Sequence, residues 1–214
     1  DSVFIAAGNL SYPGLQASSG NSVSFSSDGA EAQLLFNPVT TGQVYFSFIF
    51  KVSDMTNWTK GGYFAFLGGF QSRLNIQPIG NQFGIGVAKA NSLADVIWLL
   101  NGADSVKFDL DSEIFVVMNY DVDAGTSEVW VNPASTDLEA ATAPNSDLLL
   151  TGANIAEIGK FSIRQDSESE TPTIVMDEVR VGLTWASVTP ASSGNSVADL
   201  SSTTRSVYPT PVTE

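Results

Sequence analysis

Apolar and polar residues alternate with a period of two along most of this chain. In the run 43–52, one side carries Val44, Phe46, Phe48, Phe50 and Val52, and the other carries Tyr45, Ser47, Ile49 and Lys51. Successive side chains of a β-strand point to opposite faces of the sheet. The run therefore predicts a strand with one buried face and one mixed face.

Similar runs cover residues 22–26, 32–36, 63–67, 73–77, 82–88, 114–122, 127–132, 155–165 and 172–183. Clusters of Gly, Asn, Asp, Pro and Ser separate them, and such clusters favour turns. Only residues 90–101 and 137–143 have a helical pattern, and each is short enough to be a loop with one helical turn. The sequence predicts an all-β fold, a jelly-roll β-sandwich of two antiparallel sheets.

The composition changes near residue 190. Residues 191–214 are rich in Ser, Thr and Pro and contain few large apolar residues. This composition is typical of a linker. We therefore expect one β-sandwich domain over residues 1–190, followed by a linker over residues 191–214.

The charge and the missing residue types exclude several classes of function. The chain has 9 Lys+Arg against 23 Asp+Glu, a net charge of −14, and neither His nor Cys. Without His and Cys there is no Ser-His-Asp or Cys-His nucleophile, no disulfide and no zinc site of the usual type. The negative charge argues against nucleic acid as a partner, and the chain has no apolar run long enough for a membrane helix.

Two acidic segments are interpreted as turns. The segment from Asp121 to Glu128 superficially resembles a calcium loop, but its Gly is at the fifth position instead of the sixth. A hairpin joining residues 114–122 to 127–132 explains its Asp and Gly residues. The segment from Asp109 to Glu113 precedes an apolar strand and is expected to be a solvated turn.

Tryptophan residues in polar surroundings are the candidates for ligand contact. Trp58 lies in the polar segment 53–62, and Trp98 lies in the irregular stretch 90–105 beside Asn101. An exposed Trp next to polar groups can stack on a sugar ring or anchor a protein partner. The alternative is a loop Trp that folds back over the edge of the sandwich.

Asp177 is predicted to be a buried carboxylate. With strict alternation it shares a strand face with Val175, Val179 and Val181, so it points into the sandwich. A buried carboxylate requires a cation or several hydrogen-bond donors. The alternatives are therefore a metal ligand, an Asp held by backbone N–H groups, or an Asp paired with Arg.

Several segments spread along residues 1–190 form a recognisable series. They are, in chain order, Asn9-Leu-Ser-Tyr-Pro-Gly-Leu15, Ser22-Val-Ser-Phe25, Gly42-Gln-Val-Tyr-Phe-Ser-Phe48, Tyr120-Asp121, Val129-Trp-Val-Asn-Pro133, Met176-Asp-Glu-Val-Arg-Val-Gly182 and Thr184-Trp185. Together they resemble the concanavalin A-like (laminin-G-like) lectin and glucanase jelly rolls of secreted bacterial proteins. In these relatives the Asp of the last strand is a calcium ligand. The resemblance implies a structural calcium ion at Asp177, with Asp28 or Glu31 as the second carboxylate.

The resemblance does not extend to catalysis. Laminarinase-type members have a Glu-x-Asp-x-x-Glu strand, and the nearest segment here is Asp109-Leu-Asp-Ser-Glu113, which has the wrong arrangement of acids. Lyases of this superfamily typically use His, which this chain lacks. We therefore expect a protein that is not an enzyme.

A second resemblance is found in the tail. Ser206-Val-Tyr-Pro-Thr-Pro-Val-Thr-Glu214 is similar to the start of the C-terminal sorting domain of type IX secretion substrates, with Thr210 in place of the usual Asn. This implies a Bacteroidetes-type bacterium and a secreted or cell-surface protein. The segments Asp1-Ser-Val3 and Asp104-Ser-Val106 match the O-glycosylation motif of such bacteria, with Ser2 and Ser105 as acceptors.

Two functions are compatible with these features. The first is a non-catalytic extracellular recognition module that binds a glycan or a surface protein, or mediates adhesion. The alternative is a structural subunit of an extracellular filament or surface layer that assembles by tail or strand exchange. In that case the tail residues 202–214 add to the sheet edge of a neighbouring copy.

Overall fold

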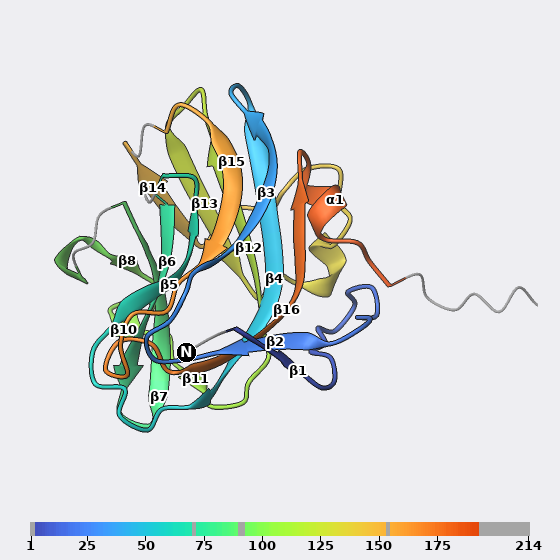
Figure 1. Ribbon diagram of the computed structural model, residues 1–214. Coiled ribbons are helices and arrows are strands. Elements are labelled where there is room, and N and C mark those ends of the chain that lie inside the picture. The colour runs from blue at the N-terminus through green and yellow to red at the C-terminus, as the bar shows by residue number, and fades with distance from the viewer. Residues whose placement is uncertain (1–2, 70–71, 90–92, 153–154, 193–214) are drawn as a thin grey trace, which may run out of the picture.

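The protein is a β-sandwich of two sheets packed face to face (Figure 1). The computed structural model describes residues 3–69, 72–89, 93–152 and 155–192. The first sheet has the order β1-β2-β16-β4-β12-β13-β14. Its strands are β1 (Phe4–Ala6), β2 (Ser22–Phe25), β4 (Gln43–Asp54), β12 (Ile114–Asp121), β13 (Thr126–Val131), β14 (Leu148–Thr151) and β16 (Thr173–Gly182).

The second sheet has the order β11-β7-β6-β5-β15-β3, and β8 also pairs with β7. Its strands are β3 (Ala32–Val39), β5 (Gly62–Leu67), β6 (Ser72–Ile79), β7 (Gln82–Ala88), β8 (Ile97–Trp98), β11 (Phe108–Asp109) and β15 (Ile158–Ile163). A small ladder joins β9 (Leu100–Asn101) to β10 (Asp104–Ser105). The pairings are antiparallel, which confirms the predicted all-β jelly-roll sandwich.

Helical structure is limited to single turns in the described part of the chain. These are η1 (Leu93–Asp95), η2 (Ser135–Asp137) and α1 (Trp185–Val188). The first two fall in or beside the stretches for which the sequence predicts a loop with one turn. The described part contains no helix that is long and apolar enough to cross a membrane.

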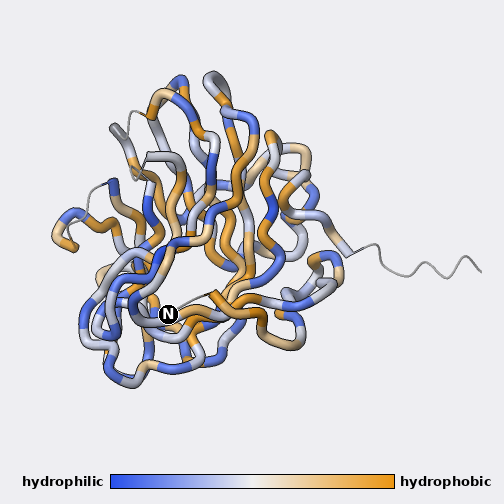
Figure 2. Tube along the Cα trace, in the orientation of Figure 1, coloured by the Kyte–Doolittle hydropathy of each residue, from blue (hydrophilic) through white to orange (hydrophobic). Residues whose placement is uncertain are grey.

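The main core fills the space between the sheets. The five residues predicted for the buried face of β4 all belong to it, and each is fully buried: Val44, Phe46, Phe48, Phe50 and Val52. Figure 2 shows hydrophobic positions concentrated along the strands and hydrophilic positions concentrated at the turns. Period-two alternation thus identified the inner face of β4 correctly.

A second core covers the outer face of the first sheet. It contains Tyr45 and Ile49 of β4, Phe115 and Val117 of β12, Trp130 of β13, and residues Leu10, Leu15, Leu138, Trp185 and Val188 from the surrounding loops and α1. The ring centroids of Trp130 and Trp185 are 5.0 Å apart. Ser47 donates a hydrogen bond to the carbonyl oxygen of Val188 at 2.6 Å. The face of β4 predicted to be mixed is therefore buried under the loops and α1.

A β-bulge in β16 changes which face its residues occupy. Asp177 is opposite Ile49 and Arg180 is opposite Ser47, so β16 has one residue more than β4 at this point. The extra residue is accommodated by Glu178, whose φ is 56°. Asp177 consequently lies on the side of the second core, whereas Val181 packs against the main core. The prediction that Asp177 shares a face with Val179 and Val181 and points into the sandwich is wrong.

The two acidic segments form turns, as predicted. Asp121 and Thr126 are paired at the end of the β12–β13 hairpin, and the Asp121 carboxylate accepts a hydrogen bond from the Ala124 N–H at 2.8 Å. In the other segment, Asp111 has a φ of 60° and forms an ion pair with Lys51 at 3.0 Å. Glu113 instead accepts hydrogen bonds from Ser11. These acids therefore engage separate partners.

The described chain ends just beyond the predicted domain boundary. Ala191 forms an isolated bridge with Leu15, and the Ser192 N–H donates to the carbonyl oxygen of Gly14 at 2.7 Å. Most of the predicted linker 191–214, including the segment 202–214 proposed for self-assembly, lies outside the described residues.

Candidate functional site

The outer face of the second sheet carries polar and aromatic side chains in a regular row. Tyr63 of β5 is opposite Asn75 of β6, Asn75 is opposite Gly86 of β7, and Gly86 is opposite Trp98 of β8. The flanking residues Leu74, Ile76, Ile85 and Val87 belong to the main core. Because side chains alternate along a strand, the row itself faces outward.

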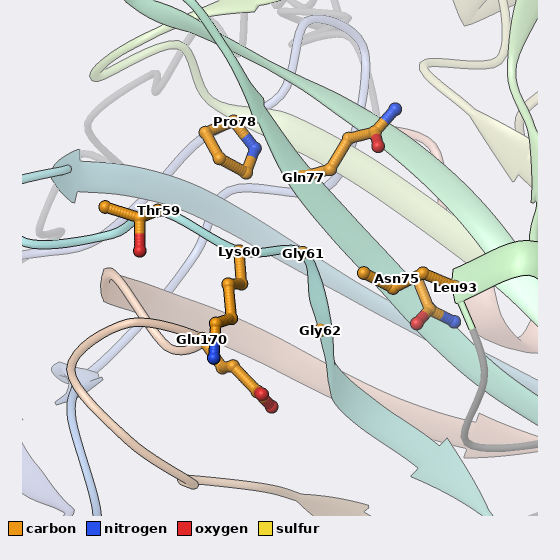
Figure 3. A pocket seen from close by; sticks show the side chains of 9 residues that line it. All are labelled: Thr59, Lys60, Gly61, Gly62, Asn75, Gln77, Pro78, Leu93 and Glu170. Carbon is orange, nitrogen blue, oxygen red and sulfur yellow. The ribbon is translucent and has the colours of Figure 1, made fainter.

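A polar cavity of about 440 Å³ lies at this face (Figure 3). It is lined by Thr59, Lys60, Gly61, Gly62, Asn75, Gln77, Pro78, Leu93 and Glu170. Asn75 is buried, with its side-chain N–H donating to the carbonyl oxygen of Arg73 at 3.1 Å, whereas Lys60 and Thr59 are exposed. The cavity thus combines two amide side chains with an ammonium, a carboxyl and a hydroxyl group.

Two glycines allow the wall of the cavity to pack closely. A Cβ atom at Gly61 would lie 3.0 Å from the Cβ of Gln77 and 3.1 Å from the Cδ2 of Leu93. At Gly62 it would lie 3.3 Å from the carbonyl oxygen of Glu170. Such contacts are tight for a side chain, so glycine lets the segment before β5 lie against both β6 and the loop that carries Glu170.

Basic and aromatic side chains extend the site along the same face. The guanidinium carbons of Arg73 and Arg164 lie 4.6 Å and 4.2 Å from the centre of the Tyr63 ring. The ammonium of Lys160 lies 5.9 Å from the centre of the Phe66 ring. Burial lowers the pKa of Arg73, and the positive charge of Arg164 lowers it further, while Tyr63 opposes the change.

Two carboxyl groups meet at the edge of the cavity. A hydrogen bond between Asp166 and Glu170 lowers the pKa of Asp166 and raises the pKa of Glu170. Burial and the negative charge of Asp166 raise the pKa of Glu170 further. Arg164 forms an ion pair with Asp166 at 2.6 Å. In Figure 3 the side chain of Lys60 points toward Glu170. Because the two pKa values shift in opposite directions, Glu170 remains protonated to a higher pH than Asp166.

Trp58 is buried and does not lie exposed at the surface. Its side chain is 4% exposed and belongs to the main core, and its indole N–H donates to the carbonyl oxygen of Glu170 at 3.1 Å. The expectation of an exposed Trp58 is wrong. The side chain folds back into the core, which buries the apolar ring and gives the indole N–H a hydrogen-bond acceptor. Trp58 instead holds the loop that forms one wall of the cavity.

Trp98 and Asn101 lie near this face in different ways. Trp98 is half-buried at the end of the outward-facing row, and its ring covers Gly86, since a Cβ there would lie 2.7 Å from the Trp98 ring. Asn101 is exposed in β9, where it pairs with Asp104. Ligand contact by these two residues stays a prediction.

The residues predicted to bind calcium are not brought together. Both oxygens of Asp177 accept backbone hydrogen bonds, from Leu10 at 2.9 Å and from Glu178 at 2.8 Å. Asp28 and Glu31 are exposed. Within residues 3–69, 72–89, 93–152 and 155–192 there is no group of three or more Asp and Glu residues placed to hold a metal ion. The three residues do not fit a shared calcium site, and a structural calcium ion stays a prediction.

The predicted glycosylation sites also stay predictions. Ser2 lies outside the described residues. Ser105 is half-buried in β10, opposite Leu100.

Sequence reasoning missed the main residues of the site, namely Tyr63, Arg73, Asn75, Gln77 and Arg164. A signal was present in the predicted strand 73–77, where polar residues occupy every second position. The alternation indicates a polar outer face, but it does not show which strands lie next to it. The pairing of β5, β6 and β15 was needed to collect these side chains on one surface.

Comparison with known proteins shows distant structural likeness only. No protein-family model and no curated protein matches the chain. A heptameric SAP-like pentraxin from Limulus polyphemus is 12% identical with a TM-score of 0.46, over 78% of this chain and 80% of that chain. The binding domain of botulinum neurotoxin DC, solved with rat synaptotagmin II, is 10% identical with a TM-score of 0.46, over 86% and 43% of the two chains. The catalytic domain of a family 131 glycoside hydrolase from Coprinopsis cinerea is 14% identical with a TM-score of 0.41, over 67% and 57%.

Proposed function

We propose that this protein is a non-catalytic, secreted or cell-surface recognition module that binds a glycan at the outer face of the second sheet. The glycan occupies the cavity lined by Asn75, Gln77, Lys60 and Glu170. Its hydroxyl groups exchange hydrogen bonds with the two side-chain amides, which both donate and accept.

The observation that carries this proposal is the difference between the two outer faces of the sandwich. The outer face of the first sheet is buried under the second core. The outer face of the second sheet has a cavity of about 440 Å³ with polar groups that converge from three separate segments. A concave site with a few oriented polar groups is the usual form of a ligand-binding site.

Recognition is favoured over catalysis by the arrangement of the acids. Asp166 and Glu170 are hydrogen-bonded to each other. A glycosidase instead holds its two carboxyl groups roughly 5 Å or more apart, on either side of the bond that is cleaved. The carboxyl pair therefore supports a binding role for this edge of the cavity.

A glycan array with purified protein tests the proposal. We expect binding to a limited set of glycans that is lost in Asn75→Ala and Gln77→Ala. The matched control is Asn145→Ala, which removes an exposed amide away from the cavity. Array signals that persist in both cavity variants, or that fall equally in the control, would show that the glycan does not bind here.

One observation favours the structural alternative. An apolar groove of about 310 Å³ opens between the edges of the two sheets and is lined by Val3, Val23, Ala32, Gln33, Leu34, Phe161, Ile163, Met176 and Val179. The edge strand β1 exposes 61% of Phe4 and 80% of Ile5, and the edge strand β3 exposes 70% of Leu35. Figure 2 shows the hydrophobic stretch of β1 beside the label of the N-terminus. Exposed apolar edge strands are templates for pairing with another chain.

We infer as a second candidate that the groove accepts residues 202–214 of a neighbouring copy and so builds a filament. This candidate predicts concentration-dependent assembly of the full chain in size-exclusion chromatography and electron microscopy. Leu34→Lys places a charge in the groove, and Ile5→Lys places one on the adjacent edge strand β1. Both are expected to abolish assembly, whereas Leu149→Lys, at an exposed position of β14, leaves it intact. A full chain that stays monomeric at high concentration contradicts the candidate.

A further inference from the structure

Four basic side chains of this acidic protein lie in the cavity or on the outer face of the second sheet. The chain has 9 Lys+Arg in total. Arg73, Lys160 and Arg164 lie on the outer face of the second sheet, and Lys60 lines the cavity. The whole chain has a net charge of −14 and repels anions at long range, so these four cations are the groups on this face that can attract an anion.

Two of these cations lie against the same aromatic ring. The guanidinium groups of Arg73 and Arg164 both lie within 5 Å of the centre of the Tyr63 ring, which is itself 8% exposed. The Tyr63 ring attracts each cation, but the two cations repel each other, and burial makes that repulsion stronger. An anion placed against both guanidinium groups would remove the repulsion and gain charge-assisted hydrogen bonds.

The arginine pair is continuous with the cavity. Tyr63 is opposite Asn75 in the sheet, and Arg73 precedes Asn75 by two positions on the same face of β6. The side chain of Asn75 also donates to the carbonyl oxygen of Arg73. A ligand whose ring lies in the cavity can therefore extend a substituent along the sheet to the arginines.

We propose that the ligand of this face is an anionic glycan, whose carboxylate or sulfate group binds against the guanidinium groups of Arg73 and Arg164. This inference rests on the glycan-binding function proposed above and specifies the class of glycan. Asp166 forms an ion pair with Arg164 and remains 38% exposed. It sets the orientation of the Arg164 guanidinium and limits the site to an anion that can contact Arg73 at the same time.

Calorimetric titration of the full chain with three polymers tests the inference. Hyaluronan carries carboxylates, dextran sulfate carries sulfates, and unmodified dextran carries neither. We expect at least one charged polymer to bind, about tenfold or more tightly than dextran, with an affinity that falls as salt is added. The charged polymer that binds identifies the anionic group.

The variants Arg73→Gln and Arg164→Gln are each expected to weaken binding about tenfold. Lys107→Gln removes the same charge from an exposed position away from the cavity and is expected to change binding less than twofold. Arg73→Lys keeps the charge and loses the planar geometry, so it is expected to give an intermediate affinity. Thermal unfolding shows which variants are folded. If Arg164→Gln does not fold, the binding measured for Arg73→Gln decides the outcome.

The outcomes separate this inference from the function on which it rests. If a neutral glycan binds as tightly and depends on Asn75 and Gln77, the anionic ligand is wrong and glycan recognition stands. If Lys107→Gln weakens binding as much as Arg73→Gln, the polymer is attracted by basic side chains in general, and the proposed arginine site is wrong. If neither the polymers nor the glycan array give binding, both proposals fail.

Discussion

The carboxylate of Asp177 accepts a hydrogen bond from the backbone N–H of Leu10 at 2.9 Å, although 167 positions separate the two residues in the sequence. The other carboxylate oxygen accepts from the N–H of Glu178, the residue that forms the bulge in β16. One buried side chain thus ties the N-terminal loop to the bulge and supports the second core, to which Leu10 belongs.

Replacement of Asp177 is expected to destabilise the fold. Asp177→Ala leaves two backbone N–H groups without their partner, and each buried unsatisfied group costs about 1–3 kcal/mol. Asp177→Asn keeps one acceptor oxygen and should cost less than the alanine variant. Urea unfolding measures both, with Asp28→Asn as a control that should lie within about 0.5 kcal/mol of the natural protein. Equal stability of Asp177→Ala and the control would contradict the assigned role.

Chelation distinguishes the two interpretations of the same carboxylate. If Asp177 is held by backbone N–H groups alone, excess chelator leaves the thermal unfolding midpoint unchanged. If a structural calcium ion is bound at Asp177, the chelator lowers the midpoint of the natural protein and has little further effect on Asp177→Asn. The comparison therefore needs both proteins, each measured with and without added calcium.

Trp58 is expected to be a stability residue that also shapes the cavity. Trp58→Phe keeps most of the ring packing but removes the hydrogen bond to the Glu170 carbonyl, at a cost of about 1–2 kcal/mol. Trp58→Ala also leaves a void in the main core and should cost about 3–5 kcal/mol. Chemical denaturation measures both. An alanine variant as stable as the natural protein would contradict the buried position.

The carboxyl pair predicts a pH dependence with a defined sign. Because the pKa of Glu170 is raised, its contribution to stability is present below its usual pKa of 4.5 and is lost as the pH rises through the raised value. The pKa of Asp166 is lowered, so its contribution is present above 3.8 and is lost as the pH falls through the lowered value. The pair therefore stabilises the fold most between pH 3.8 and 4.5, where both contributions are present in full.

Glu170→Gln tests this dependence, because the amide still donates to Asp166 and does not ionise. We expect its thermal midpoint to match the natural protein near the optimum of the pair and to exceed it increasingly as the pH rises to 7. Glu168→Gln, at an exposed neighbouring position, corrects for the change in net charge. A difference that stays constant with pH would show that the two carboxyl groups do not share a proton.

Gly86 is predicted to tolerate no side chain. A Cβ atom there would lie 2.5 Å from Val96 Cγ1 and 2.8 Å from the carbonyl oxygen of Ile97, in addition to its contact with Trp98. Gly86→Ala must therefore shift β8, at an expected cost of about 1–3 kcal/mol. Because Trp98 moves with β8, its fluorescence should change as well. An unaltered fluorescence spectrum and unaltered stability would show that β8 is not packed on β7.

The fold was predictable because the alternation of residues is a local property. The inner face of β4, the β12–β13 hairpin and the helical turns η1 and η2 could each be identified from a short stretch of sequence, whereas α1 was not predicted. Asp177 shows where this approach fails. One extra residue in β16 reverses the faces on either side of it, and the pattern Val175 to Val181 gives no sign of the bulge.

The candidate site was less predictable because it depends on which strands are neighbours. Trp58 lies in a polar segment, yet the carbonyl oxygen that accepts its N–H belongs to Glu170, 112 positions later. Tyr63 and Arg164 come from β5 and from the end of β15, and only the sheet pairing brings them together. Local sequence does not contain this information.

The position of Ala191 determines how the protein can be displayed. Ala191 packs against the second core, on the outer side of the first sheet, and the cavity opens on the outer side of the second sheet. Ser192 therefore lies on the side of the sandwich opposite the cavity. An attachment made at Ser192 would leave the proposed ligand site facing the surroundings, away from the point of attachment.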